Sequence, residues 1–191
     1  GGGTSVSNAL TIPNDESRMV VSVDTRRMNK IESVDEKNLL ATVQAGIVGI
    51  DLETQLEKLG FTAGHEPDSI EFSTLGGWIS TNASGMKKHK YGNIEDIVQN
   101  VTLITPSGTI NQKKPLTRSS IGVKAQNMVF GSEGNFGIIT KATIKIHKKP
   151  EASTFESILF HNWEDGVKFM YEVAHSNLIP ASSRLMDNSM V

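Results

Sequence analysis

Residues 73–85 read STLGGWISTNASG, a stretch of two adjacent glycines among small hydroxyl and amide side chains. Paired glycines let a flat ligand approach the backbone, and the hydroxyl and amide groups can bond to a diphosphate or to ring heteroatoms. The alternative is an Ω-loop packed by its own side chains, and Trp78 either contacts a ligand or fills core. The surrounding region, residues 61–91, has little periodicity, and an ordered loop of about 30 residues is usually functional.

Two further glycine-rich stretches lie before and after this one. Residues 1–5 read GGGTS, which either gathers backbone N–H groups around a phosphate or is a flexible turn or tag remnant. This first stretch lacks the Gly-Lys-Ser/Thr ending of a P-loop and is not a Rossmann fingerprint. Residues 131–140 read GSEGNFGIIT and form either a plain hairpin or bulge, or a loop that offers backbone donors to a ligand.

Apolar alternation predicts strands at residues 19–24, 39–44, 97–104 and 138–146, with a hairpin return at 109–110 after a turn at 105–108. A short helix is expected at about residues 52–59. Asp51 is its predicted N-cap, Gly60 follows it in a left-handed conformation, and Leu52, Leu56 and Leu59 share its apolar face. Residues 113–127 are polar and carry no clear pattern.

Residues 148–151 (KKPE) mark the best domain boundary in the chain. A strand at 155–160, a helix at 163–175 and a strand at 181–186 are expected after it. We therefore expect one domain over residues 1–150 and the first β-α-β portion of a second α+β domain over 151–191. The opening glycines and the abrupt end suggest a segment cut from a longer protein at both ends.

Composition excludes several classes of protein. The 191 residues carry a net charge of -2, so no polyanion-binding field is expected and nucleic acid is not a predicted partner. Cysteine is absent, which excludes disulfides, thiolate metal sites and a cysteine nucleophile. The five histidines show no metal-ligand spacing, so no metal site is predicted. Residues 87–90 (KKHK) either form a solvated loop or attract a phosphorylated substrate or an anionic membrane.

The order of the three glycine-rich stretches resembles the vanillyl-alcohol-oxidase-type flavoproteins from residue 1 to about residue 150. The resemblance implies an α+β fold with a PCMH-type FAD-binding domain, built of mixed or antiparallel sheets with flanking helices. It is strongest toward the ether-lipid-forming branch, at residues 64–74 (GHEPDSIEFST), 84–88 (SGMKK), 91–96 (YGNIED) and 184–188 (RLMDN). Asn8 and the pair Asn135-Phe136 depart from the pattern, and asparagine tolerates a left-handed backbone at the first position.

FAD is the cofactor that the resemblance implies. Residues 1–5 would hold its diphosphate, residues 68–74 and 81–84 would contact the diphosphate, ribityl chain and flavin, and residues 133–139 would add backbone contacts. The predicted cofactor-binding residues are Gly1, Gly2, Gly3, Thr4, Ser5, Asp68, Ser69, Ile70, Glu71, Phe72, Ser73, Thr74, Thr81, Asn82, Ala83, Ser84, Glu133, Gly134, Asn135, Phe136, Gly137, Ile138 and Ile139.

The activity implied by the resemblance is an alkyl transfer of ether-lipid synthesis. The acyl group of acyl-dihydroxyacetone phosphate is exchanged for a fatty alcohol through a flavin adduct, with no net redox change. Arg184 matches an active-site arginine and could grip a carboxylate or phosphate; alternatively it forms a surface salt bridge with Asp187 or Glu172. The family's catalytic tyrosine and histidine cluster would follow Val191, so this chain alone is expected to be inactive.

The same resemblance implies a peroxisomal, membrane-associated homodimer that acts on small lipid substrates. Two alternatives stay open. One is an FAD-dependent 2-hydroxy-acid dehydrogenase or oxidase of the same fold, since such enzymes share the STNASG segment. The other is a non-catalytic fragment that no longer holds flavin, because a sheet that lacks a strand before Gly1 would have an open edge.

Overall fold

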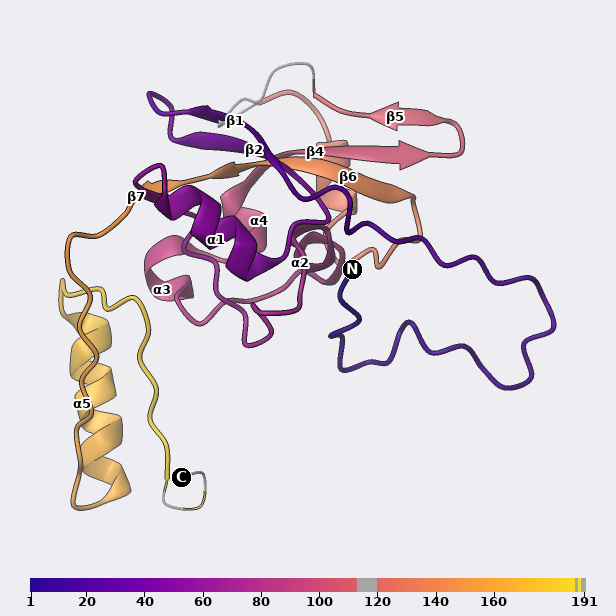
Figure 1. The fold of residues 1–191 in the computed structure, drawn as a ribbon. Coiled ribbons are helices and arrows are strands. Elements are labelled where there is room, and N and C mark those ends of the chain that lie inside the picture. The colour runs from indigo at the N-terminus through magenta and orange to yellow at the C-terminus, as the bar shows by residue number, and fades with distance from the viewer. Residues whose placement is uncertain (113–119, 188, 190–191) are drawn as a thin grey trace.

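The computed structural model describes residues 1–112, 120–187 and 189, and its architecture is α+β (Figure 1). A five-stranded antiparallel sheet forms the frame. Its strands follow the spatial order β1 (Ile31–Asp35), β2 (Leu40–Gln44), β6 (Ile138–Lys145), β4 (Val98–Thr105) and β5 (Gly108–Ile110). A second, two-stranded antiparallel sheet joins β3 (Phe61–Thr62) to β7 (His147–Lys148).

The two faces of the large sheet differ in chemistry because successive side chains of a strand point to opposite sides. On the inner face, Ala142 of β6 pairs with Val43 of β2 and with Val101 of β4, and all three are buried. On the outer face, the Thr42 and Thr143 hydroxyl oxygens lie 3.2 Å apart. One apolar and one polar face explain why only one side of the sheet carries helices.

Four helices lie on the apolar side of the sheet, as Figure 1 shows. They are α1 (Gly49–Glu57), α2 (Leu75–Thr81), α3 (Lys88–Tyr91) and α4 (Ile94–Ile97). Leu52 and Leu56 of α1 and Ile79 of α2 are fully buried. Burying each such side chain contributes about 1.5–3 kcal/mol, so this layer is the main apolar core.

The helix α1 differs from its prediction at both ends. It begins at Gly49 with Val48 as N-cap, so Asp51 lies in the first turn and is not the cap. It ends at Glu57, and Leu59 is therefore 54% exposed and does not share the buried face. Gly60 has a φ of 82°, which confirms the predicted left-handed position after the helix.

The predicted strands at 39–44, 97–104 and 138–146 and the hairpin return at 109–110 are confirmed as β2, β4, β6 and β5. The strands predicted at 19–24, 155–160 and 181–186 are wrong, because these segments have no paired neighbour among the described residues. The 61–91 region is more regular than predicted, since it contains β3, α2 and α3. Of the unassigned stretch, residues 113–119 lie outside the described residues and Ala125–Met128 form the 3-10 helix η1.

The segment after the sheet contains α5 (Trp163–His175), which has the predicted bounds. The Asn162 side chain caps it by accepting a hydrogen bond of 2.8 Å from the Asp165 N–H. Gly166 is the one buried residue of α5, and a side chain there would meet Leu185 and Phe160. Figure 1 shows α5 and the segment after it extending away from the sheet, and Asn188 lies outside the described residues. No helix of the described part is both long and apolar enough to cross a membrane.

Candidate functional site

A cavity of about 730 Å³ lies where the three glycine-rich stretches meet. Residues 1–5, the stretch around α2 and the loop before β6 all line it, and Ala45, just after β2, contributes to its lining. The volume lies within the range of about 300–1,000 Å³ that is usual for cofactor and small-molecule sites. Segments far apart in the sequence therefore build one site beside the apolar core.

Close backbone packing brings these stretches together. A Cβ atom added to Gly2 would lie 2.1 Å from the carbonyl oxygen of Phe72, and one added to Gly137 would lie 2.1 Å from that of Ile104. Any side chain at either position would collide with backbone. The first stretch can therefore lie against residues 72–73, and the loop before β6 against β4, because both positions are glycine.

Hydrogen bonds within the protein occupy the first N–H groups of α2. The Leu75 N–H donates to the Ile47 carbonyl at 3.1 Å, the Gly76 N–H to the Ala45 carbonyl at 2.8 Å, and the Gly77 N–H to the Thr74 hydroxyl at 3.3 Å. The hydroxyl of Ser73 accepts a 2.7 Å hydrogen bond from the Trp78 indole. These groups fix α2 in place and leave it few donors for a ligand.

The donors that remain lie in the first glycine-rich stretch. Within the described part of the chain, the N–H groups of Gly2, Gly3 and Thr4 have no protein acceptor, and neither the Thr4 nor the Ser69 hydroxyl has a protein partner. Clustered unpaired N–H groups favour an anion. The predicted diphosphate contacts at residues 1–5 are compatible with these unpaired groups, and hydroxyl groups of the neighbouring loop lie beside them.

The cavity gathers most of the predicted cofactor-binding residues but not all of them. Those that line it are Gly1, Gly2, Gly3, Thr4, Ser5, Ser69, Ser73, Thr74, Thr81, Ala83, Ser84, Glu133, Gly134, Gly137, Ile138 and Ile139. The remaining predicted residues, which are absent from the lining, are Asp68, Ile70, Glu71, Phe72, Asn82, Asn135 and Phe136.

Several lining residues were not in the predicted set. Gly76, Gly77 and Ser80 belong to the 73–85 stretch, so its paired glycines were the signal that could have found them. Val23, Thr25 and Ala45 come from parts of the sequence with no glycine-rich or polar pattern. Their place in the lining follows from the fold alone.

Arg184 pairs with a predicted cofactor-binding residue. Its guanidinium Nη2 lies 3.4 Å from Oδ1 of Asp68, and both side chains are more than half exposed. The expected surface partners, Asp187 and Glu172, are not the partner in this ion pair. Because Pro67 and Ser69 on either side of Asp68 line the cavity, the pair places Arg184 near its mouth.

His65 is buried behind Trp78, with its ring 4.9 Å from the indole in an edge-on arrangement. Neither ring nitrogen has a hydrogen-bond partner among the residues that the structure describes. Burial lowers the pKa of His65 to about 4, because the low-dielectric interior disfavours the charged imidazolium. The ring is therefore neutral near pH 7 and supports Trp78, which lines the cavity.

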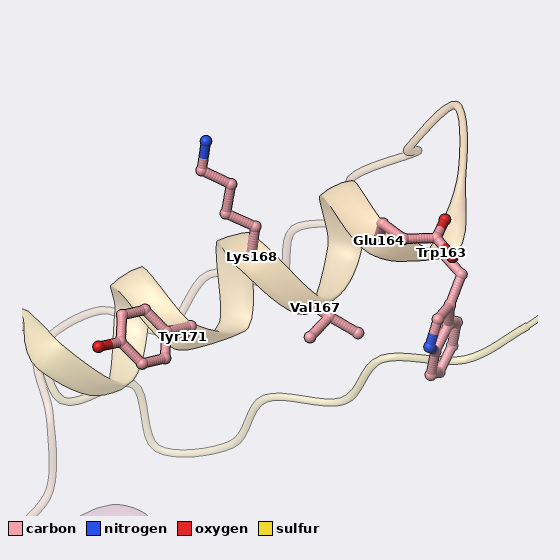
Figure 2. A pocket seen from close by; sticks show the side chains of 5 residues that line it. All are labelled: Trp163, Glu164, Val167, Lys168 and Tyr171. Atoms are coloured by element: carbon pink, nitrogen blue, oxygen red, sulfur yellow. The ribbon is translucent and has the colours of Figure 1, made fainter.

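A second hollow, of about 480 Å³, lies on α5 (Figure 2). In Figure 2, Trp163, Val167 and Tyr171 lie on one side of the helix and Lys168 projects from the other. Glu164 completes the lining, which contains none of the predicted cofactor-binding residues. This mostly apolar surface, formed by one helix, lacks the converging polar groups of a cofactor site.

The α+β fold and the glycine-rich cavity are those of a cofactor-binding domain, and the sequence matches one family of such domains. Residues 1–112 match the family described as FAD binding domain, and the chain belongs to this family. FAD is thus the cofactor of this domain. The glycine-rich lining and the unpaired N–H groups of residues 1–5 fit it, because both suit a ligand with a diphosphate and flat rings.

The chain is similar throughout to one named enzyme. It is 54% identical over 98% of its length to alkyldihydroxyacetonephosphate synthase of Caenorhabditis elegans, of which it covers 32%. It is 41% identical over 98% of its length to the Dictyostelium discoideum enzyme of that name, of which it covers 30%. A solved structure of alkyldihydroxyacetonephosphate synthase aligns with a TM-score of 0.72 and 44% identity, covering 80% of this chain and 26% of that one. The chain thus spans about a third of the length of these curated relatives.

Proposed function

We propose that the protein containing this chain is an FAD-dependent alkyl transferase of ether-lipid synthesis. The observation that carries the proposal is the 54% identity over 98% of the chain to alkyldihydroxyacetonephosphate synthase. The cavity supports it, because the stretches most similar to that branch, residues 64–74 and 84–88, surround or adjoin the lining. The bound flavin supplies the reactive centre of this chemistry.

The proposed reaction exchanges one oxygen substituent for another. Acyl-dihydroxyacetone phosphate loses its fatty acid when the carbon–oxygen bond of the glycerone carbon breaks, and a fatty alcohol oxygen forms the new bond. The alcohol proton leaves with the carboxylate or to solvent, so no electrons are gained or lost overall. FAD therefore serves here without net redox change.

In the proposed reaction, the residues of this chain bind the cofactor and orient the substrate. Residues 1–5 hold the cofactor diphosphate through unpaired N–H groups, and residues 76–77 let flat rings approach the backbone. Arg184 stands near the mouth of the cavity, where its guanidinium can bind the leaving carboxylate bidentately. Its exposed pairing with Asp68 is worth at most about 1 kcal/mol, so an anionic substrate can displace Asp68.

The same resemblance suggests the substrates, the cellular location and the oligomeric state of the whole protein. We propose small lipid substrates, a peroxisomal location, association with the lumenal membrane face and a homodimeric state. These proposals rest on the resemblance to the ether-lipid branch. Fractionation of cells that express the longer protein, with and without carbonate extraction, tests the location and the membrane association, and light scattering tests the homodimer.

The test of the reaction uses the longer protein and a labelled fatty alcohol. The expected products are alkyl-dihydroxyacetone phosphate and free fatty acid in equal amounts, with no electron acceptor consumed. Arg184→Lys should lower the exchange rate at least tenfold while flavin absorbance is retained, because lysine cannot form the bidentate contact. Arg18→Lys, which changes an exposed arginine paired with Glu16, is the matched control. Exchange that is absent in the wild type would contradict the proposal.

A second candidate is a flavin-dependent 2-hydroxy-acid dehydrogenase. The observation in its favour is 33% identity over 90% of this chain to a D-lactate dehydrogenase of Anaerostipes hadrus, of which the chain covers 36%. Anaerobic addition of D-lactate to the longer protein separates the two candidates. Bleaching of the flavin absorbance would support the dehydrogenase, and an unchanged spectrum with productive exchange would support the alkyl transferase.

A further inference from the structure

The carboxylate of Glu53 holds the segment that leads into the cavity, although Glu53 itself is not among the lining residues. It lies in the second turn of α1. Its Oε2 atom accepts a 2.7 Å hydrogen bond from the Thr62 hydroxyl. Its Oε1 atom accepts from the Ala63 N–H at 3.1 Å and from the Gly64 N–H at 3.2 Å. Three consecutive residues therefore donate to one side chain.

No backbone carbonyl takes the place of Glu53 at these two N–H groups within the part of the chain that the structure describes. Ala63 and Gly64 are both buried, and the Thr62 hydroxyl offers a second acceptor only to the Gly64 N–H, at 3.0 Å. A buried N–H without a partner is unfavourable, because it has lost its hydrogen bond to water. Glu53 is therefore what satisfies the backbone where the chain leaves β3.

This arrangement fixes geometry more than it adds stability. Burial raises the pKa of Glu53 because the interior disfavours its charge, and the bonds from Thr62, Ala63 and Gly64 oppose that shift by stabilising the carboxylate. When desolvation and hydrogen bonding oppose each other, the net contribution to folding is small. A buried polar group with all its bonds made nevertheless specifies one conformation of the groups bonded to it. Glu53 is thus suited to set the position of residues 62–64.

The held segment supports the wall of the cavity. Gly64 has a φ of 72°, and an added Cβ would lie 2.3 Å from the Tyr91 ring, so the backbone packs directly on that ring. The next residue, His65, lies with its ring 4.9 Å from the indole of Trp78. Trp78 lines the cavity. A shift of the held residues would therefore move the support behind Trp78.

The same segment continues into the lining itself. Pro67 and Ser69, which follow shortly after the held residues, both line the cavity. Just before them, the Glu66 carbonyl accepts a 2.8 Å hydrogen bond from the Met86 N–H, and the Glu66 carboxylate pairs with Lys87. This second contact should keep the segment folded when the bonds to α1 are removed. The effect of those bonds on the cavity can then be measured by itself.

We propose that Glu53 is a positioning residue of the cofactor site. It acts through residues 62–64, which set the place of His65 behind Trp78. The same residues set where the chain at 67–69 enters the cavity wall. A wall that is ordered before the ligand arrives raises the affinity, because binding need not order it. The inference rests on FAD being the cofactor of this domain and does not depend on the reaction that the whole protein performs.

The test is a fluorescence titration of FAD into the longer protein after removal of its flavin, at a temperature where circular dichroism shows each variant folded. Glu53→Ala should weaken FAD binding by about tenfold or more, because binding must then order residues 62–69. Glu53→Gln should stay within about threefold of the wild type. Its amide oxygen can accept from both N–H groups, and its amide nitrogen can donate to the Thr62 hydroxyl.

Two variants of the same helix separate positioning from stability. Leu56→Ala, at a fully buried position, should lower the melting temperature at least as much as Glu53→Ala and still bind FAD within about threefold of the wild type. Glu57→Ala removes an exposed carboxylate that pairs with Lys149 and should change neither the melting temperature nor the affinity measurably.

Three results would count against this role of Glu53. Wild-type affinity in Glu53→Ala would overturn the proposal. An equal loss of affinity in Leu56→Ala would also overturn it, since the effect would then follow stability alone. An equal loss in Glu53→Gln would overturn the role of the hydrogen bonds, since the charge would then be what matters. Because no turnover is measured, a failure of the proposed alkyl transfer would leave these outcomes unaffected.

Discussion

The sheet region, residues 31–148, and the α5 region, residues 151–187, differ most in what they bury. Every buried hydrophobic residue of the described chain lies between Leu40 and Ile146. In the α5 region, Phe155 is 92% and Leu159 is 97% exposed, and Gly166 is the one buried residue of the helix. The sheet region therefore has its own core and the cavity beside it, whereas α5 depends on local helix energetics and a few contacts.

Equivalent truncations in the two regions should separate them most strongly. Leu56→Ala, at a fully buried position of α1, should lower the free energy of unfolding by about 2–5 kcal/mol through lost burial and a cavity. Leu159→Ala, at an exposed position, should change it by less than about 0.5 kcal/mol. Urea unfolding followed by circular dichroism measures both, and similar losses would mean that the α5 region shares the core.

Acid should destabilise the sheet region through His65. Its folded pKa of about 4 lies below the ordinary value of 6.5, so the unfolded chain takes up the proton first. The stabilising contribution is complete above pH 6.5 and falls by about 3 kcal/mol as the pH drops toward 4. The free energy of unfolding of the wild type should therefore fall relative to that of His65→Phe as the pH drops across this window.

The matched histidine of the α5 region is His161, which is exposed. His161→Gln, a change outside the apolar core, is the control and should leave the pH dependence of unfolding as in the wild type. A pH profile of His65→Phe that runs parallel to that of the wild type would show that His65 is not held in its neutral form by burial.

A change at the N-cap of α5 should have a smaller and more local effect. Asn162→Ala removes the hydrogen bond to the Asp165 N–H and should weaken α5 by about 1 kcal/mol. Hydrogen exchange should accelerate within α5, while the core amides of β4 and β6 keep their protection. Exchange that accelerates equally in both regions would show that they unfold as one unit.

The helix α5 was predicted correctly from the sequence and the strand at residues 19–24 was not, and the difference has a physical reason. The bounds of α5 could be predicted because helix formation depends on neighbouring residues, here a capping Asn162 and an apolar stripe. Residues 19–24 have the same β-rich character as β2, yet only β2 has partners, β1 and β6, on both sides. Alternation in a sequence indicates a strand that could form, and pairing decides whether it does.

The parts of the candidate site where glycine allows close packing could be predicted from the sequence. The parts that depend on the path of the chain could not. Gly2 and Gly137 lie where any side chain would collide with backbone, so the glycine-rich stretches did reveal the cavity. Thr25 and Ala45 reach the lining through the path of the chain, which no local pattern encodes. The pairing of Arg184 with Asp68, 116 positions apart, was hidden for the same reason.

The most direct test of the central claim is the visible absorbance of the purified chain after addition of FAD and desalting. If the three glycine-rich stretches form the cofactor site, the wild type should retain about one flavin per chain. Gly2→Ala should retain little, because its Cβ would collide with the Phe72 carbonyl, and Gly166→Ala in α5 should retain as much as the wild type. A folded wild-type chain that retains no flavin, or a Gly2→Ala chain that retains it fully, would contradict the account.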